Sequence, residues 1–261
     1  SPSILLVVTI VGSLTAFFAA SVGLVQNDLK RVIAYSTCSQ LGYMVFSCGL
    51  SHYSIAFFHL VNHAFFKALL FLSAGSIIHG LSDEQDLRKM GSLVKFFPVS
   101  YVMILIGSLA LTGFPFFTGF YSKDLILETA FSSYSFMGNF AFILGNLAAL
   151  FTSFYSFRLL FLTFINYSNS YRSYVQNSHE GSLTLLFPLF CLCFGSIFFG
   201  FLAKDLFSGL GTSTFNDSIH CQINNASLIN SEFISPFFKN VPLFCTFIGF
   251  VLSFLFINGS F

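Results

Sequence analysis

Residues 4–25 read ILLVVTIVGSLTAFFAASVGLV and contain no charged side chain. The hydrocarbon core of a bilayer is about 30 Å thick, and a helix crosses it with about 20 apolar residues. The whole chain is 55% hydrophobic and 8% charged, whereas a soluble domain carries about 25% charged residues. One soluble core of this size cannot hide so much apolar surface, so the sequence predicts a membrane protein.

The same kind of apolar run recurs along the chain and predicts an all-α, polytopic helix bundle with about seven transmembrane helices. We expect a helix bundle over 1–203, a polar surface loop over 204–240 and a last transmembrane helix over 241–261. No basic tract with interleaved aromatic residues is present, so nucleic-acid binding is not expected. The predicted spans are roughly 4–25, 32–50, 54–78, 97–129, 137–165, 183–203 and 241–257.

The fourth span is too long for one straight helix and contains the sequence TGFPFFTGFYSKD. Pro115 lacks a backbone donor and breaks a helix. Inside a membrane, such a break is tolerated only where protein or water satisfies the freed backbone groups. We therefore expect two half-helices, about 97–113 and 117–129, of the kind found along ion and substrate pathways.

The positive charges of the loops are unequal on the two sides. Loops 26–31, 79–96 and 166–182 follow the first, third and fifth spans and define side A. The positive-inside rule places the side with more Lys and Arg at the cytoplasm or the mitochondrial matrix, which predicts that side A faces inward. Side A carries Lys30, Arg31, Arg88, Lys89, Lys95 and Arg172, against Lys204 and Lys239 on side B.

Three ionisable residues stand four positions apart in the third span, within the sequence HLVNHAFFK. His59, His63 and Lys67 share one helix face, because positions i, i+4 and i+8 lie above one another. A lysine near the middle of a span is costly unless it faces the bundle interior or water. Two other interpretations are a zinc-binding histidine pair, for which a third ligand at helical spacing is lacking, and a polar patch that holds helices together. We favour a proton relay.

A second charged pair, Lys123 and Asp124, follows the proline break and lies beyond the membrane midpoint toward side B. This position suits a proton exit. The alternative is a pair at a helix end that reaches the membrane surface. In the second span, the sequence AYSTCSQ offers hydroxyls and an amide, which could bind water or could hold neighbouring helices together. In the fifth span, Arg158 is expected to reach side A. The six cysteines are interpreted as small apolar residues, and no metal site is expected.

Five segments together resemble the chain 5 family of NADH:ubiquinone oxidoreductase, the respiratory complex I, in its mitochondrially encoded form. That family is built from Mrp-antiporter-like modules, each with two inverted five-helix repeats, and the resemblance implies that this chain is the second half of such a module. It further implies that Lys67 is the central channel lysine, with His59 and His63 as relay partners and Lys123 and Asp124 as the exit pair. The segments are NDLKRVIAYSTCSQLGYM, HLVNHAFFKALLFLSAGSIIH, DEQDLRKMGSL, GFPFFTGFYSKDLILE and FTSFYSFRLLFLTF.

The resemblance implies a proton-translocating membrane-arm subunit in the mitochondrial inner membrane, with FMN, iron–sulfur clusters and ubiquinone on other subunits and no cofactor on this chain. Expected partners are the neighbouring antiporter-like chain 4, membrane lipids, and a separate chain with the N-terminal half of the module if the gene is split. The other possibility is that the sequence is a fragment. A stand-alone Mrp-type cation/proton antiporter subunit and a non-pumping assembly scaffold are the alternative functions.

Overall fold

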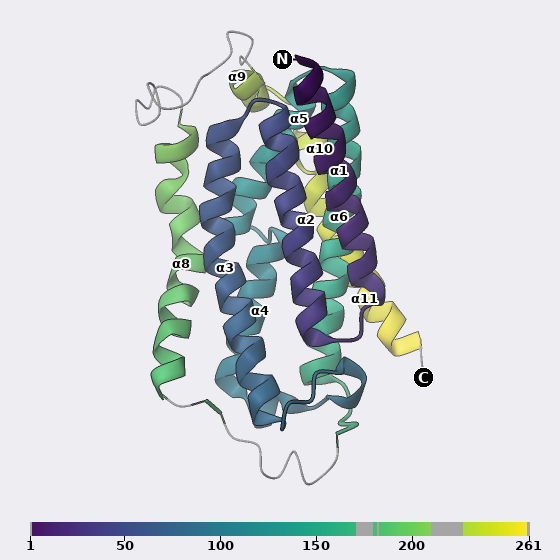
Figure 1. Ribbon diagram of the computed structural model, residues 1–261, viewed down its shortest axis with the longest axis vertical. Helices are drawn as coiled ribbons and strands as arrows, with labels where there is room; N and C mark the ends of the chain where they lie inside the picture. The colour runs from purple at the N-terminus through teal and green to yellow at the C-terminus, as the bar shows by residue number, and fades with distance from the viewer. Residues whose placement is uncertain (1, 171–179, 182, 210–226, 260–261) are drawn as a thin grey trace.

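The structure is a computed structural model that describes residues 2–170, 180–181, 183–209 and 227–259, and these form a bundle of helices that run alternately up and down (Figure 1). This arrangement confirms the all-α prediction. The longer helices are α1 (Pro2–Val25), α2 (Leu29–Gly49), α3 (Tyr53–Gly80), α4 (Pro98–Thr112), α5 (Leu125–Ser132), α6 (Phe136–Leu160), α8 (Leu183–Ser208) and α11 (Val241–Gly259). The shorter ones are η1 (Leu87–Lys89), η2 (Leu93–Lys95), α9 (Ser227–Glu232) and α10 (Pro236–Lys239), with π-helical turns η3 (Phe120–Asp124) and η4 (Phe161–Ile165).

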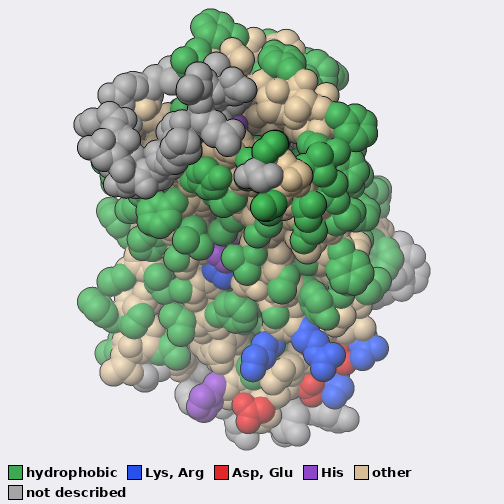
Figure 2. Space-filling model, turned by 45° about the horizontal axis from the view of Figure 1, so that its top comes forward, with side chains coloured by type: hydrophobic (Ala, Val, Ile, Leu, Met, Phe, Trp, Pro, Cys, Tyr) green, Lys and Arg blue, Asp and Glu red, His purple; other side chains and the backbone are tan. Residues whose placement is uncertain are grey.

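The described helices fit a membrane by length and composition. Four of them are long and apolar enough to cross it, namely Pro2–Val25, Tyr53–Gly80, Phe136–Ile165 and Leu183–Ser208, and α4 and α11 are shorter apolar helices. The helix α2 is less apolar and packs against α1, α3 and α6. Apolar side chains cover much of the visible face, and Lys and Arg gather at one end (Figure 2). The chain is therefore an integral membrane protein.

The end of the bundle that we call side A joins three connections. The amide of Leu29 donates to Gln85 O (2.9 Å), and the amide of Leu87 donates to Asn27 O (2.8 Å). The amide of Asn169 donates to Met90 O (3.3 Å). The loops predicted to share one side therefore touch one another, although Arg172 lies outside the described residues.

The break in the fourth span is confirmed. Helix α4 stops at Gly113, whose φ of 84° is a left-handed conformation that favours glycine. Helical structure resumes before η3, and the irregular segment between them is buried only at Thr118 and Gly119, since Phe114 and Phe116 are 40% and 79% exposed. The Thr118 hydroxyl donates to Ser196 O of α8 (2.9 Å), and the Asn62 amide of α3 donates to Thr118 O (3.3 Å). Neighbouring helices thus supply a partner for the Thr118 carbonyl at the end of the break, as a break inside a membrane requires.

Close helix packing at the front of the bundle depends on small residues. A Cβ on Gly42 of α2 would lie 2.8 Å from the Cα of Ala16 on α1, so only glycine allows this approach. At the other end of the chain, residues 204–240 include the last residues of α8 and the helices α9 and α10, and residues 210–226 lie outside the described part. The surface loop expected over that range stays a prediction.

Candidate functional site

The three ionisable residues of α3 are buried inside the bundle. His59, His63 and Lys67 are 1%, 8% and 5% exposed, and the ring centroids of His59 and His63 are 6.3 Å apart. The Lys67 ammonium donates a hydrogen bond to Ser36 Oγ of α2 and lies 5.6 Å from the centroid of the Phe71 ring. The helical spacing of four residues therefore produces a stripe that faces protein and not lipid.

His59 connects three helical elements. Its Nε2 is 3.1 Å from Gln40 Oε1 of α2, and its Nδ1 is 2.9 Å from Ser122 Oγ of η3. An amide oxygen can only accept, so Nε2 carries the proton in a neutral ring and Nδ1 accepts from the Ser122 hydroxyl. The imidazole thus bridges the stripe on α3 and the half-helix beyond the break.

Lys123 follows Ser122 directly and is also buried, with 1% exposure. Its ammonium donates to Thr152 Oγ1 of α6 (3.2 Å) and lies 5.5 Å from the centroid of the Tyr43 ring on α2. This burial excludes the alternative in which Lys123 reaches the membrane surface. Asp124 is half-buried and points to a different side of the helix, because adjacent residues are about 100° apart.

We call the set Lys67, His63, His59, Ser122 and Lys123 the polar row. His59 contacts Ser122 and lies beside His63, Lys67 stands four residues after His63 on α3, and Lys123 follows Ser122 in the chain. Helix α3 runs from side B at Tyr53 to side A at Gly80 (Figure 1). His59 therefore lies about 12 Å closer to side B than Lys67 does, from eight residues at about 1.5 Å each. The row starts at mid-membrane and leads toward side B.

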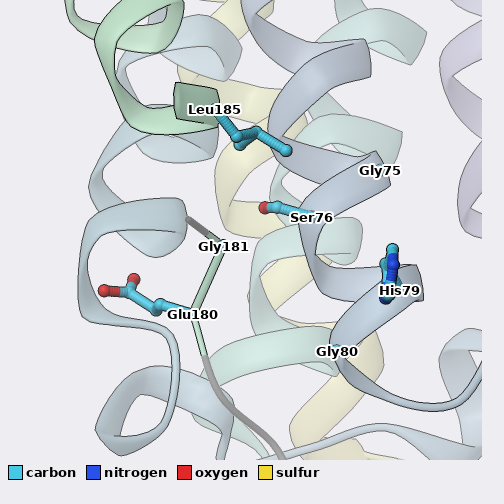
Figure 3. A pocket seen from close by; sticks show the side chains of 7 residues that line it. All are labelled: Gly75, Ser76, His79, Gly80, Glu180, Gly181 and Leu185. Atoms are coloured by element: carbon cyan, nitrogen blue, oxygen red, sulfur yellow. The ribbon is translucent and has the colours of Figure 1, made fainter. Parts of the chain in front are cut away.

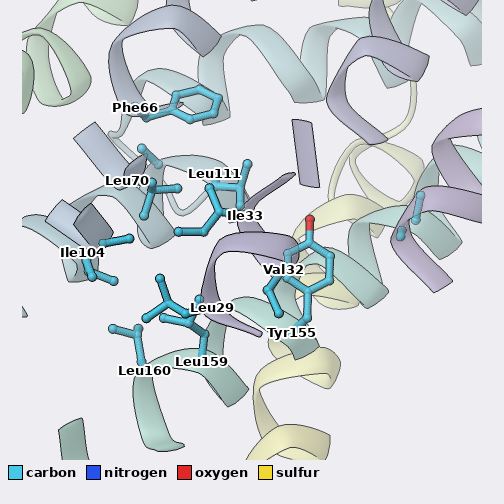
Figure 4. Close-up of a cluster of buried hydrophobic side chains, with 14 of the residues drawn as sticks. Leu29, Val32, Ile33, Phe66, Leu70, Ile104, Leu111, Tyr155, Leu159 and Leu160 are labelled. Carbon is cyan, nitrogen blue, oxygen red and sulfur yellow. The ribbon is translucent and has the colours of Figure 1, made fainter. Parts of the chain in front are cut away.

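Part of the main apolar cluster of the bundle lies between the polar row and side A (Figure 4). Val32 and Ile33 precede Ser36 on α2, and Leu70 follows Lys67 on α3, so all three lie closer to side A. Leu159 and Leu160 of α6 complete the cluster from the opposite wall. On this side of Lys67 the walls from α2 and α6 are therefore apolar, whereas α3 and α4 contribute the buried hydroxyls of Ser73, Ser76 and Ser100.

Several buried polar atoms beside the row have no hydrogen-bond partner among the described residues. They include Gln40 Nε2, Asn62 Oδ1 and His63 Nε2. Leaving such a group unpaired costs about 1–3 kcal/mol, and bound water commonly fills this role. The Tyr155 hydroxyl on α6 interacts with Ser36 but lacks the geometry of a hydrogen bond. The site thus has the polar surface to hold a short water chain.

Two further features lie at side A. Arg158 of α6 donates to Leu24 O (2.7 Å), Gln26 O (2.9 Å) and Asn27 Oδ1 (2.7 Å). It reaches side A as expected and binds the last turn of α1 and the two residues Gln26 and Asn27 that follow it. A cavity of about 380 Å³ lies between α3 and the start of α8 and is lined in part by Ser76, His79 and Glu180 (Figure 3).

The Glu180 carboxylate already accepts from the amides of Val99 and Ser100 at the start of α4 (2.6 and 3.1 Å). The cavity is separate from the polar row. No group of three or more His, Cys, Asp or Glu in the described residues is arranged to hold a metal ion.

The sequence pattern singled out the charged residues but not their neutral partners. Ser36 and Gln40 were open to two interpretations, water binding or helix packing, and their four-residue spacing on one face of α2 was a usable signal. Thr152 gave no signal of its own, because a threonine in an apolar run is most often a packing residue that donates to its own helix.

Comparison with known proteins places the chain in a family. A family model described as "NADH:quinone oxidoreductase/Mrp antiporter, TM" matches residues 1–152. The NADH-ubiquinone oxidoreductase chain 5 of Marchantia polymorpha is 57% identical over 250 residues, which are 95% of this chain and 37% of that protein. The chain 5 protein of Phytophthora infestans is 56% identical over 243 residues, which are 93% of this chain and 37% of that protein.

The chain thus spans well under half the length of these relatives. A solved structure of the Mrp complex from a Dietzia species has the same fold, with a TM-score of 0.72 at 21% identity over 96% of this chain and 27% of that one. By its sequence match and its fold, the chain belongs to the NADH:quinone oxidoreductase/Mrp antiporter transmembrane family.

Proposed function

We propose that this chain is part of a proton-translocating membrane-arm subunit of respiratory complex I, which couples electron transfer from NADH to ubiquinone to proton pumping. The observation that supports this most is the polar row, which joins two buried lysines across a broken helix. The relatives named chain 5 support complex I as the assembly in which the row works.

In this proposal the proton moves along side chains that take up and release it in turn. Lys67 holds the proton at mid-membrane and gives it up when the electrostatic field along the membrane arm changes. His63 and His59, with water at the unpaired atoms, carry it to Ser122 and Lys123, and Asp124 accepts it for release at side B. Because part of the apolar cluster lies between Lys67 and side A, we expect the proton to reach Lys67 laterally, from the rest of the module.

We further propose a location and a set of partners. The chain would lie in the mitochondrial inner membrane with loops 26–31, 79–96 and 166–182 facing the matrix, as the charge asymmetry predicts. Its neighbours would be the antiporter-like chain 4, membrane lipids and, if the gene is split, a separate chain with the remaining helices. FMN, iron–sulfur clusters and ubiquinone would be bound by other subunits, and redox chemistry would not occur on this chain.

A stand-alone Mrp-type cation/proton antiporter is the second candidate, and the shared fold with an Mrp complex favours it. A Na⁺-dependent proton flux in the absence of NADH would support that function. A non-pumping scaffold is the third. It predicts that the complex fails to assemble without this chain but pumps normally when Lys67 is neutral.

The test is Lys67→Met in the complex that contains the chain, purified and reconstituted into liposomes. Methionine fills similar volume without a titratable group, so we expect fewer protons to be pumped for each NADH oxidised. The control is Lys95→Met, an exposed lysine in η2 at side A. An unchanged ratio of protons to NADH for Lys67→Met in the assembled complex contradicts the proposal.

A further inference from the structure

Beyond Asp124, the half-helix α5 carries one more carboxylate on the way to side B. Glu128 stands four residues after Asp124, so the two side chains lie on one face of the helix with Cβ atoms about 5–6 Å apart. Their carboxyl groups are close enough to repel each other electrostatically. A second carboxylate therefore stands one helical turn beyond Asp124 toward side B.

Glu128 lies where the interior of the bundle meets the outside. Its side chain is 13% exposed, and its Oε2 is 3.8 Å from Nζ of Lys239 on α10, which is 47% exposed. Lys204, at the side B end of α8, adds a second attraction to the same carboxylate. The charged groups that act on Glu128 are thus Asp124 on its own helix, Lys239 on α10 and Lys204 on α8.

The helix α10 is held over α5 by its own contact. The rings of Phe131 on α5 and Phe238 on α10 stack with centroids 4.5 Å apart and an interplanar angle of 23°. The ion pair is therefore not needed to bring α10 into place. An ion pair that is this long and partly exposed contributes at most about 1 kcal/mol. The stabilisation of α10 by this ion pair therefore does not explain why the carboxylate of Glu128 lies at this position.

We propose that Glu128 is a further proton acceptor, which takes the proton from Asp124 and passes it to side B beneath α10, with Lys239 as its counter-ion. This inference rests on the proposed function. In the step, the carboxylic acid of Asp124 loses its proton and the carboxylate of Glu128 gains it. Glu128 then returns to the carboxylate by releasing the proton to water at side B, and Lys239 favours that charged form.

The experiment compares two neutral variants in the assembled complex, reconstituted into liposomes. Glu128→Gln keeps the size of the side chain but cannot carry a proton, and we expect proton release for each NADH oxidised to fall to the level of Lys67→Met. Lys239→Gln breaks the same ion pair but keeps the carboxylate, so release persists at neutral pH. Its pH profile moves toward higher pH, because a carboxylate without its cation holds the proton more tightly.

The variant Glu128→Asp keeps a carboxyl group and is expected to restore part of the release. Glu232→Gln, an exposed carboxylate on α9, is the matched control. Assembly of every variant is measured as the amount of NADH-active complex on a native gel.

Normal proton release by an assembled Glu128→Gln complex overturns the inference. Equal losses of assembly and release for Glu128→Gln and Lys239→Gln also overturn it, because they assign the pair a purely structural role. Normal pumping by Lys67→Met contradicts the proposed function, and it also contradicts this inference, which depends on that function. If only Glu128→Gln pumps normally, the proposed function stands.

Discussion

His59 is the side chain on which the continuity of the polar row depends, so its replacement is the sharpest test of the row. In His59→Leu, Gln40 Oε1 and Ser122 Oγ both lose a partner in the protein interior. An unpaired buried group costs about 1–3 kcal/mol, and the Ser122 hydroxyl, freed from His59, can turn only to Thr118 O at 3.4 Å. We expect His59→Leu to destabilise the chain by about 2–4 kcal/mol and also to interrupt the relay.

The matched variant His59→Gln separates these two effects. A glutamine amide can both donate and accept, so it retains much of the hydrogen bonding to α2 and η3 but cannot carry a proton as an imidazole does. A positioned proton-transfer group contributes about 10²–10⁴-fold in rate, so proton transfer along the row should slow by a factor of that order.

The assay measures proton pumping for each NADH oxidised in liposomes, and thermal unfolding of the detergent-solubilised complex measures stability. His59→Gln should lose pumping with near-normal stability, and His59→Leu should lose both. Normal pumping by an assembled His59→Gln complex would refute the role of the imidazole and with it the continuity of the row.

Two further predictions concern side A. Arg158→Ala removes three charge-assisted hydrogen bonds at the end of α1 and should cost about 2–4 kcal/mol, whereas Arg31→Ala, whose exposed ion pair is worth at most about 1 kcal/mol, should change the thermal midpoint little. The hydrogen bonds from Arg88 hold the pKa of Asp86 below its usual range. The pair therefore stabilises the folded loop at every pH above the unfolded-state pKa of about 3.9. This stabilisation is lost as the pH falls through the lower folded-state pKa. Cleavage of that loop by an acid protease should therefore rise only below about pH 4, and Asp86→Asn should be cleaved readily at all acid pH values; equal cleavage of the two proteins would contradict the pairing.

Local patterns predicted much of the architecture. The length of each apolar run determines whether a helix can cross a membrane, and the break at Gly113 and Pro115 follows from the backbone chemistry of those two residues. Which loops share an end follows from the alternation of the spans, and the count of basic residues predicts which end faces the matrix. The common face of His59, His63 and Lys67 follows from 3.6 residues per turn. Each of these properties depends on residues that are near in sequence, so no packing information was needed.

Only the tertiary structure decided which groups meet those residues. Ser36 and Gln40 reach the stripe from another helix, Thr152 reaches Lys123 from a third, and Arg158 binds carbonyls more than a hundred positions away in sequence. The same holds for Glu128, which meets Lys239 only because α10 folds back over α5. The sequence by itself determined where charge is buried along each helix. The packing of distant helices decided what that charge touches, because the partner of a helix face is set by the shape of the whole bundle and not by the residues beside it in the chain.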